Sequence, residues 1–396
     1  MAEAGSPMSA RTYLLAAGAF TVGTSGYILS GLLPAVSREL DVSLSTAGQL
    51  LTVFALSYAV AAPVLAALTG RWDRRKLLVA ALLVSALGNV LSALAPNYPL
   101  LLAARVVSAL GAAAYTPAAT LVATVLTTPE HRGRAVATVF GGLTFSLILG
   151  VPAGSLLGGT IGYQTVFAAV GAASLIAAGM VGLGVPRVAT PPVVGLRERL
   201  AVAADRRVMT VLAMTVLACL AAFSVFTYIS PLLAATAGVH GTVISLLLFA
   251  YGVGGAIGNS LSGRLTDRFG SRRLLFVIFA VFTAVLATLP LTATTTATAG
   301  VALFVWGLFT WSVNPPIQNW LIELAPAGGG LVLSLNASAI YLGVGLSGLF
   351  GGLVIDTVGI TLLPPIAGVL ALAAFGLLIR ASRRPRVPEQ PVLLPV

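Results

Sequence analysis

Twelve apolar runs, separated by short polar or basic segments, determine what this chain can fold into. Crossing the hydrocarbon core of a membrane takes about 20 helical residues, and runs of this size predict membrane-spanning helices. Helices also satisfy their own backbone polar groups, which an open segment in lipid cannot do. The runs lie at 12–36, 45–69, 77–95, 99–126, 135–161, 165–185, 209–237, 242–262, 274–291, 299–322, 331–355 and 361–380.

The composition excludes a soluble domain and argues against a nucleic-acid partner. Charged residues make up 8% of the 396 residues and hydrophobic residues 58%, whereas soluble domains carry about 25% charged residues. The net charge of +11 comes from Lys and Arg that lie mostly in short segments between the apolar runs. If the N-terminus is cytoplasmic, only Arg38 falls outside, and Arg105 lies within a run. The positive-inside rule therefore predicts a multi-pass protein of the cell (inner) membrane with both termini cytoplasmic.

The chain offers no signature of an enzyme or of a bound cofactor. Cys219, the one cysteine, lies in an apolar run and cannot form an intramolecular disulfide. His131 and His240 lie in different segments, so no Cys/His metal cluster can be placed. No carboxylate pair or nucleophile–base pair can be placed either, and we predict no enzymatic activity, metal or cofactor. The first apolar run exceeds the length of a signal-peptide h-region, no convincing cleavage site follows it, and the first helix is expected to be retained.

The chain is organised as two similar halves. The longest internal connection, 186–208, is polar and basic and separates a predicted N-terminal six-helix bundle, 1–185, from a C-terminal bundle, 209–381. We expect the Pro-rich tail, 382–396, to be disordered. Two parallel halves with a substrate path between them are a recurrent transporter architecture.

Each half carries an arginine-rich segment after its second apolar run. In the second half this segment is Gly263-x-x-x-Asp267-Arg268-x-Gly270-x-Arg272-Arg273. It resembles the loop signature of the major facilitator superfamily, at the matching position. In the first half the match is degraded, because Gly70 stands where the family's aspartate belongs and Asp73 where its second glycine belongs.

Three further stretches resemble the twelve-span drug:proton antiporter branch of that superfamily, in particular its arabinose-efflux-like and chloramphenicol-exporter-like permeases. They are 23–34 in the first helix, 102–111 with its arginine in the fourth, and 142–154 with its glycines and proline in the fifth. The resemblance implies an all-α membrane protein of twelve transmembrane helices in two pseudo-symmetric six-helix bundles. It also implies efflux by alternating access in exchange for protons.

One departure bears on proton coupling. Many relatives carry a carboxylate in the first helix at about the position of Gly26, and here it is absent. All eleven acidic residues fall in predicted loops or at predicted helix ends. Proton antiport is therefore implied by the resemblance and not by the residues.

Arg105 and the arginine segments are the candidate coupling and gating residues. A cation in mid-span costs about 2.5–3.5 kcal/mol on insertion scales, so Arg105 should face a polar interior. The alternative is an arginine near a helix end that snorkels or bonds helix carbonyls. The resemblance implies a cytoplasmic latch, broken in one access state, while the same arginines also set topology. The candidates are Arg105, Asp73, Asp267, Arg268 and Arg272.

Glycines of the fifth helix allow neighbouring backbones to approach closely. The motif residues are Gly150, Pro152 and Gly154. In one interpretation they seal the cavity and suppress leak. In the other they are ordinary small-residue packing.

Helical spacing and polarity select candidate substrate-binding residues. Side-chain amides are unfavourable against lipid and should point inward, either to substrate or to helix–helix hydrogen bonds. Pro315 and Pro316 should loosen the backbone hydrogen bonding beside Asn314. The candidates are Tyr27, Tyr115, Phe223, Thr227, Trp311, Asn314, Gln318, Asn336 and Tyr341.

Such a cavity suits a neutral or weakly polar organic compound, because it holds no fixed negative charge for a cationic drug. We therefore predict a monomeric secondary transporter that exports a drug-like molecule, with the substrate, protons and the lipid bilayer as its partners. A sugar or nucleoside permease, which would need a more polar cavity, and a uniporter without proton coupling are the alternatives. A non-transporting receptor would need a large soluble domain, and none is predicted.

Overall fold

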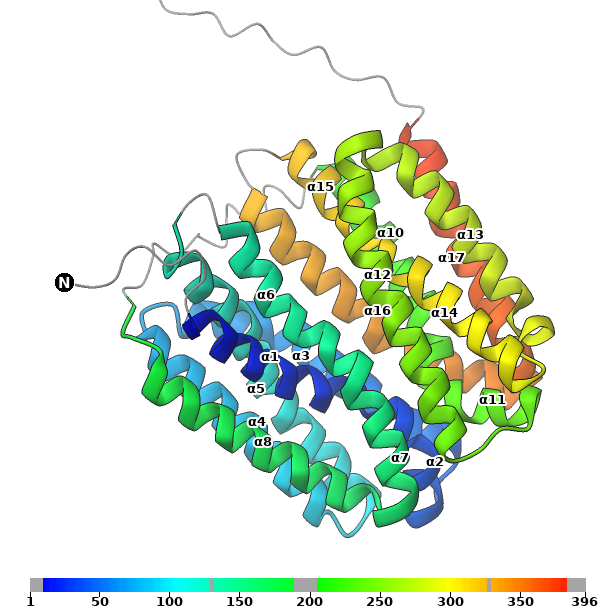
Figure 1. Cartoon of the computed structure of the whole chain (residues 1–396), viewed down its shortest axis with the longest axis horizontal. Coiled ribbons are helices and arrows are strands. Elements are labelled where there is room, and N and C mark those ends of the chain that lie inside the picture. Colours follow the sequence, from blue (N-terminus) through cyan, green and yellow to red (C-terminus); the bar gives the residue numbers. More distant parts are fainter. Residues whose placement is uncertain (1–9, 129–131, 189–204, 326–328, 383–396) are drawn as a thin grey trace, which may run out of the picture.

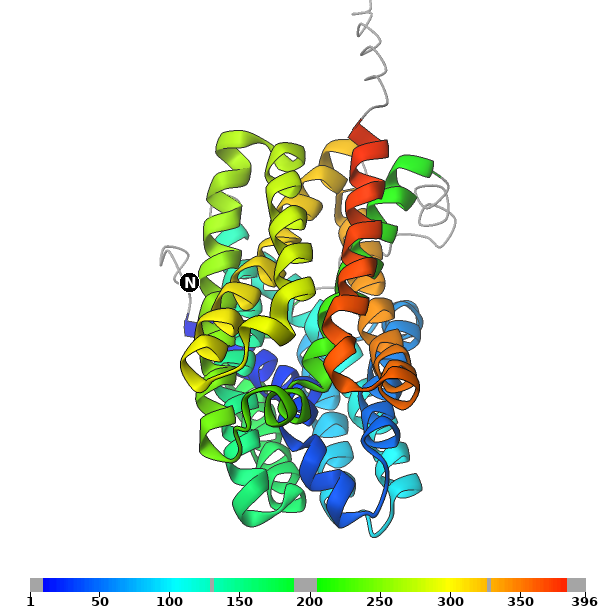
Figure 2. The same ribbon diagram turned by 90° about the vertical axis from the view of Figure 1, so that its right-hand side faces the viewer.

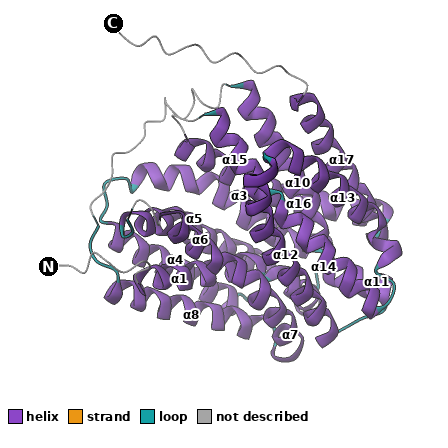
Figure 3. Cartoon of the chain, turned by 45° about the horizontal axis from the view of Figure 1, so that its top comes forward, coloured by secondary structure: helices purple, strands orange, loops and turns teal. Residues whose placement is uncertain are grey.

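The computed structural model describes residues 10–128, 132–188, 205–325 and 329–382, and this part of the chain is helical throughout, without strands (Figure 3). Most of the predicted linker and all but the first residue of the predicted tail lie outside the described residues. The first half contains α1 (Ala10–Tyr27), α2 (Leu29–Glu39), α3 (Leu44–Leu68), α4 (Arg74–Leu94), α5 (Tyr98–Val125), α6 (Arg132–Phe145), η2 (Ser146–Gly150), α7 (Val151–Ile161) and α8 (Tyr163–Gly184). The second half contains α10 (Arg206–Thr227), α11 (Ile229–Ala237), α12 (Thr242–Phe269), α13 (Ser271–Thr292), α14 (Thr296–Ser312), α15 (Asn314–Leu324), α16 (Gly329–Val358), η4 (Ile360–Leu362) and α17 (Leu363–Ser382).

The prediction of twelve membrane spans is confirmed. Eleven segments are long and apolar enough to cross a membrane, and the bent pair α1 and α2 makes the twelfth. The bend of 43° lies at Ile28, between the two helices.

Helix breaks leave backbone carbonyls that other helices satisfy. Pro34 has no N–H, so the carbonyl of Ser30, one turn earlier, loses its usual helical donor. That carbonyl accepts a hydrogen bond from Ser230 Oγ of the other half at 3.2 Å. In the same way Pro316 frees the carbonyl of Ser312, which accepts from Ser262 Oγ at 2.6 Å. The predicted loosening near Asn314 is thus a break at Val313, between α14 and α15.

The arginine segment of the second half differs from the predicted loop. Helix α12 continues to Phe269, and α13 begins at Ser271, so Gly270 alone forms the turn. Its φ of 80° is a left-handed conformation that favours glycine. The N–H of Gly270 still donates to Thr266 O at 2.8 Å, which is the last hydrogen bond of α12, and the left-handed φ of Gly270 then ends the helix.

Two glycines let α4 and α5 pack at backbone contact. A Cβ added at Gly88 of α4 would overlap the backbone nitrogen of Ser108 on α5. A Cβ added at Gly111 of α5 would lie 2.5 Å from the backbone nitrogen of Ser85 on α4. This close crossing carries Asn89 and Arg105 toward α1.

The two halves form a V (Figure 1), and Figure 2 shows the second half lying above the first in the view turned by 90°. Helices α1 to α8 form one arm, and helices α10 to α17 form the other. The arms meet near α2, α7 and α11 and diverge toward the end where the described chain begins and ends (Figure 1). We call the diverging end the arginine end, because the arginine segments at 71–76 and 264–273 lie there, and the other the opposite end.

Substitution of Gly88 by Ala should destabilise the protein. The added Cβ meets backbone and not a flexible side chain, and overpacking of this kind costs about 1–3 kcal/mol. The melting temperature of the purified protein in one detergent measures the effect.

Gly141→Ala is the matched control, because nothing lies within 4 Å of a Cβ at that helical glycine. It should leave the melting temperature unchanged or raise it, since Ala favours helix over Gly by about 1 kcal/mol. Equal melting temperatures for the two variants would contradict the tight α4–α5 crossing.

Candidate functional site

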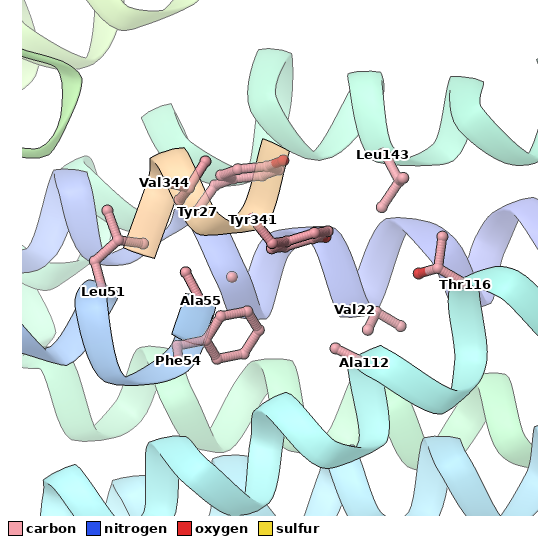
Figure 4. A pocket seen from close by; sticks show the side chains of 12 residues that line it. Val22, Tyr27, Leu51, Phe54, Ala55, Ala112, Thr116, Leu143, Tyr341 and Val344 are labelled. Carbon is pink, nitrogen blue, oxygen red and sulfur yellow. The ribbon is translucent and has the colours of Figure 1, made fainter. Parts of the chain in front are cut away.

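A small cavity lies between the two halves near the middle of the molecule (Figure 4). Helices α1, α3 and α5 supply most of its wall from the first half, and α16 supplies Tyr341 and Val344 from the second. Every lining side chain is apolar, aromatic or hydroxyl-bearing. The lining residues are Val22, Gly23, Gly26, Tyr27, Leu51, Phe54, Ala55, Ala112, Thr116, Leu143, Tyr341 and Val344.

The cavity is nearly filled by its own side chains. Its free volume of about 10 Å³ compares with the roughly 300–1,000 Å³ of a drug-sized site. A substrate therefore has to displace side chains or find the halves further apart.

Arg105 lies beside this cavity, completely buried and without an acidic partner among the described residues. Its Nη2 donates a hydrogen bond to the carbonyl of Ser25, and its Nη1 lies 3.5 Å from Ser25 Oγ. Ser25 Oγ in turn donates to Asn89 Oδ1 at 2.9 Å. Ser25 stands in the last turn of α1, where carbonyls lack helical donors and the helix dipole is negative. The guanidinium thus caps α1 at its break.

Two aromatic rings enclose the guanidinium of Arg105. Its Cζ lies 4.6 Å from the ring centre of Phe54 and 5.3 Å from that of Phe167. Phe54 also lines the cavity and lies 3.2 Å from where a Cβ of Gly26 would stand. Phe54 therefore separates the positive charge from the cavity in this conformation.

A seam of glycines and carbonyls joins the halves on the side of the opposite end. The Tyr228 hydroxyl donates to Gly348 O at 2.8 Å and lies 3.4 Å from Ser45 O of the first half. A Cβ at Gly48 would overlap that hydroxyl, and one at Gly348 would lie 2.6 Å from Gly48 O. The Ser30–Ser230 hydrogen bond lies at the same end. The seam depends on backbone approach that larger residues would prevent.

At the arginine end the charged residues contact rings. The guanidinium of Arg268 lies 5.2 Å from the ring centre of Phe269, and that of Arg272 lies 5.1 Å from that of Trp320. Asp267 is exposed, and the described arginines include none that forms an ion pair with it.

Comparison with known proteins identifies the family. The family model of the Major Facilitator Superfamily matches residues 15–327 and 211–394. The chain belongs to this superfamily. The superfamily consists of transporters and not enzymes, so the chain is a multi-pass membrane transporter, as its sequence predicted.

Superfamily relatives include drug-resistance proteins. The chain is 34% identical to the inner membrane transport protein YdhP of Escherichia coli K12, over 93% of this chain and 95% of YdhP. It is 36% identical to the chloramphenicol resistance protein of Streptomyces lividans, over 65% of this chain and 66% of that protein. A solved structure of a bacterial homologue of the human lysosomal transporter Spinster has the same fold, with a TM-score of 0.80 at 17% identity, over 96% of this chain and 98% of that chain.

The structure brings a minority of the candidate binding residues to the cavity. Tyr27 and Tyr341 line it, from opposite halves, and Phe223 stacks on Tyr27 with ring centres 5.9 Å apart. Tyr115 is fully buried elsewhere, where its hydroxyl donates to Leu15 O at 2.9 Å. Its neighbour Thr116 faces the cavity instead.

The candidate amides serve helix contacts in the second half. Asn336 lies between Thr215 Oγ1, at 2.8 Å, and Asn314, at 3.4 Å, and so links α10, α15 and α16. Thr227 Oγ1 donates to its own helix at Phe223 O. Neither Trp311, which packs against Gly255, nor Gln318 lines the cavity.

The helix-5 motif packs against the first helix. Cβ atoms at Gly150 and Gly154 would overlap the side chains of Thr24 and Ile28. Pro152 stands in the first turn of α7, just after the π-helical turn η2, where a missing N–H is tolerated. The motif thus fixes the position of α1 and α2, which supply part of the cavity wall.

Asp73 caps α4 by accepting a hydrogen bond from the Lys76 N–H at 2.9 Å. This contact is local to the first turn of α4, and no described contact links Asp73 to the other half. Its predicted gating role therefore has no support from contacts in this conformation.

Phe54, Tyr58 and Thr116 are the functional candidates that the sequence analysis missed. The Tyr58 ring stacks on Tyr341 of the other half with ring centres 3.5 Å apart. These residues carry at most a hydroxyl, so no charged or amide side chain marks them within their apolar helices. A period of three to four residues counted from Leu51 along α3 would have reached Phe54, Ala55 and Tyr58.

Replacement of Phe54 by Ala should let the protein bind small organic anions. Loss of the ring exposes the Arg105 guanidinium to the cavity, and a charge-assisted hydrogen bond is worth at least about 1.5 kcal/mol, or roughly tenfold in affinity. Calorimetric titration of the purified protein with phenylacetate measures this gain.

Leu51→Ala is the control, because it enlarges the same cavity without uncovering Arg105. Equal phenylacetate affinities for the two variants and the wild type would show that Phe54 does not cover the charge.

Proposed function

We propose that the protein exports a small, neutral or weakly polar organic compound by alternating access, in exchange for protons. The observation that carries this proposal is an uncharged, aromatic-lined cavity between two halves that contact on one side and diverge on the other. The relative named for chloramphenicol resistance supports a drug-like substrate.

We propose that the arginine end faces the cytoplasm, because the positive-inside rule favours arginine-rich segments on that side. Of the described Lys and Arg, only Arg38 lies at the opposite end and only Arg105 in mid-span. The helices of the two halves diverge toward the arginine end and contact at the glycine seam, while the Tyr58–Tyr341 stack still joins the halves between the arginine end and the cavity. Further separation of the halves at the arginine end would let an exporter load substrate from the cell interior.

The charge around the cavity favours uncharged substrates over cations. Arg105 is the only ionised group of the described membrane interior near the cavity, and its charge repels cations. No described acidic side chain is buried, so a cationic drug would enter without a counter-charge.

The latch function of Asp267 agrees with this conformation. Where the halves diverge, Asp267 has no ion pair, as expected of a latch that forms only when the cytoplasmic side closes. Proton coupling would then involve exposed carboxylates at helix ends, such as Asp267 or Asp356, or the network of Arg105, Ser25 and Asn89.

Tyr228→Phe should shift the protein toward an outward-open state. It removes the hydroxyl whose contact with Ser45 O, at 3.4 Å, crosses between the halves, whereas its hydrogen bond to Gly348 O lies within the second half. Loss of such a hydrogen bond, about 0.5–1.5 kcal/mol, corresponds to a population shift of about two- to tenfold. The measurement is the rate at which an impermeant maleimide outside cells labels Ala55→Cys in a Cys219→Ala background.

Tyr251→Phe is the matched control, because Tyr251 is buried within the second half and stacks there on Phe226. Its labelling rate should equal that of the unmodified background. If Tyr228→Phe is labelled at the same rate as the background, the Tyr228 hydroxyl does not stabilise the seam.

Transport itself is tested in proteoliposomes with an acidic lumen and a pH dye inside. Addition of neutral compounds, with chloramphenicol, nucleosides and sugars in the panel, should release protons from the lumen for the drug-like members. Arg105→Ala should lower this rate by at least about tenfold, because the variant loses the one buried charge that the described residues place beside the cavity.

Arg38→Ala, at an exposed residue of the opposite end, should leave the rate unchanged. Substrate flux without proton movement would make the protein a uniporter. Transport of sugars alone, or robust transport of quaternary ammonium compounds, would refute the proposed substrate class.

A further inference from the structure

Two aromatic stacks cross between the halves, and each contributes one ring, Tyr27 or Tyr341, to the wall of the central cavity. Tyr27 of α1 stacks on Phe223 of α10, at 5.9 Å between ring centres and 23° between ring planes. Tyr58 of α3 stacks on Tyr341 of α16, at 3.5 Å and 17°. Each pair joins one ring from the first half to one from the second.

The two stacks lie at different depths. Tyr58 lies 10 residues before the end of α3 and Tyr341 lies 12 residues after the start of α16, which is about 15–18 Å from the arginine end at 1.5 Å per residue. Tyr27 and Phe223 each lie 17 residues from the start of their helices, or about 25 Å from that end. A molecule that enters from the arginine end thus meets the Tyr58–Tyr341 stack first.

Rocking of rigid halves separates cross-half stacks and preserves stacks within a half. Phe226, Tyr251 and Trp306 pack together inside the second half, with ring centres 4.9 and 4.7 Å apart for the two closest pairs. These rings move as one body. Tyr58 and Tyr341 belong to different bodies, so their faces are exposed whenever the halves separate at that depth.

From this geometry we propose that the Tyr58–Tyr341 stack is a selectivity filter for a flat aromatic group. An aromatic ring of the substrate replaces one of the two tyrosines as stacking partner and restores the ring contact that opening removes. An aliphatic group of the same size cannot do so, because offset stacking is specific to π faces. This inference rests on the proposed export function and narrows its substrate to neutral aromatic amphiphiles.

The test compares 3-phenylpropan-1-ol with 3-cyclohexylpropan-1-ol as calorimetric ligands of the purified full-length protein. Burial of apolar surface alone favours the cyclohexyl compound, which has the larger apolar surface. Stacking favours the phenyl compound, and we expect it to bind about two- to tenfold tighter.

Variants assign that preference to the filter. Tyr58→Leu and Tyr341→Leu should abolish it, whereas Tyr58→Phe and Tyr341→Phe should keep it, because they retain the rings. Tyr13→Leu is the control, since Tyr13 is exposed at the arginine end of α1. If one Leu variant fails to fold, the other still decides the assignment, and the wild-type preference decides whether aromatic selection exists.

Three results would overturn the inference. Equal affinities, or tighter binding of the cyclohexyl compound, would refute aromatic selection and leave the proposed export function standing. A phenyl preference that persists in both Leu variants would place the filter elsewhere. A wild-type protein that binds neither compound and transports none of the neutral panel would refute the export function and this inference together.

Discussion

Hydrocarbon offers no hydrogen-bond partner, so each backbone carbonyl released by a helix break has to be satisfied within the protein. This requirement connects the main features of the molecule. The break at Ile28 ends α1, and Arg105 caps the Ser25 carbonyl there. The carbonyls that Pro34 and Pro316 release accept hydrogen bonds from Ser230 and Ser262. The Arg105–Ser25 contact lies beside the cavity, and the Ser230–Ser30 contact joins the two halves. Two of these three departures from regular helix therefore help to hold the site together.

The arrangement of charge explains why the site can be apolar and still accommodate a buried cation. Arg105 has no carboxylate among the described residues, but it has a helix C-terminus, a carbonyl and two aromatic faces. These partners are dipoles and π systems, which stabilise a cation without adding a net negative charge. The cavity beside it consequently carries no negative group that would attract cations. A carboxylate at the position of Gly26 would add a negative charge to this site. It would also have to displace Phe54, whose ring lies 3.2 Å from where its Cβ would stand.

Much of the fold followed from the sequence, because span length, loop charge and the spacing of the arginine segments report directly on topology. The twelve spans and the all-helical fold were predicted from these signals and are confirmed. The site was harder to predict, because polarity does not tell which face a side chain takes. Asn314 and Asn336 are polar and inward, yet they bond each other and Thr215. Tyr115 and Thr116 are adjacent, and only the second reaches the cavity. Phe54 and Tyr58 are uncharged aromatics in apolar helices, so only the packing of α3 against α5 and α16 distinguishes them.

The seam on the closed side has a consequence for how such a protein diversifies. Its acceptors are the main-chain oxygens of Gly348, Ser45 and Ser30. A substitution that fits sterically at one of these residues leaves the acceptor in place. Only the donors and the glycines at closest approach are restricted in identity. The cavity wall, by contrast, consists of side chains that can be exchanged one at a time. Mutation can therefore alter which molecules are accepted while the opening and closing cycle is inherited intact.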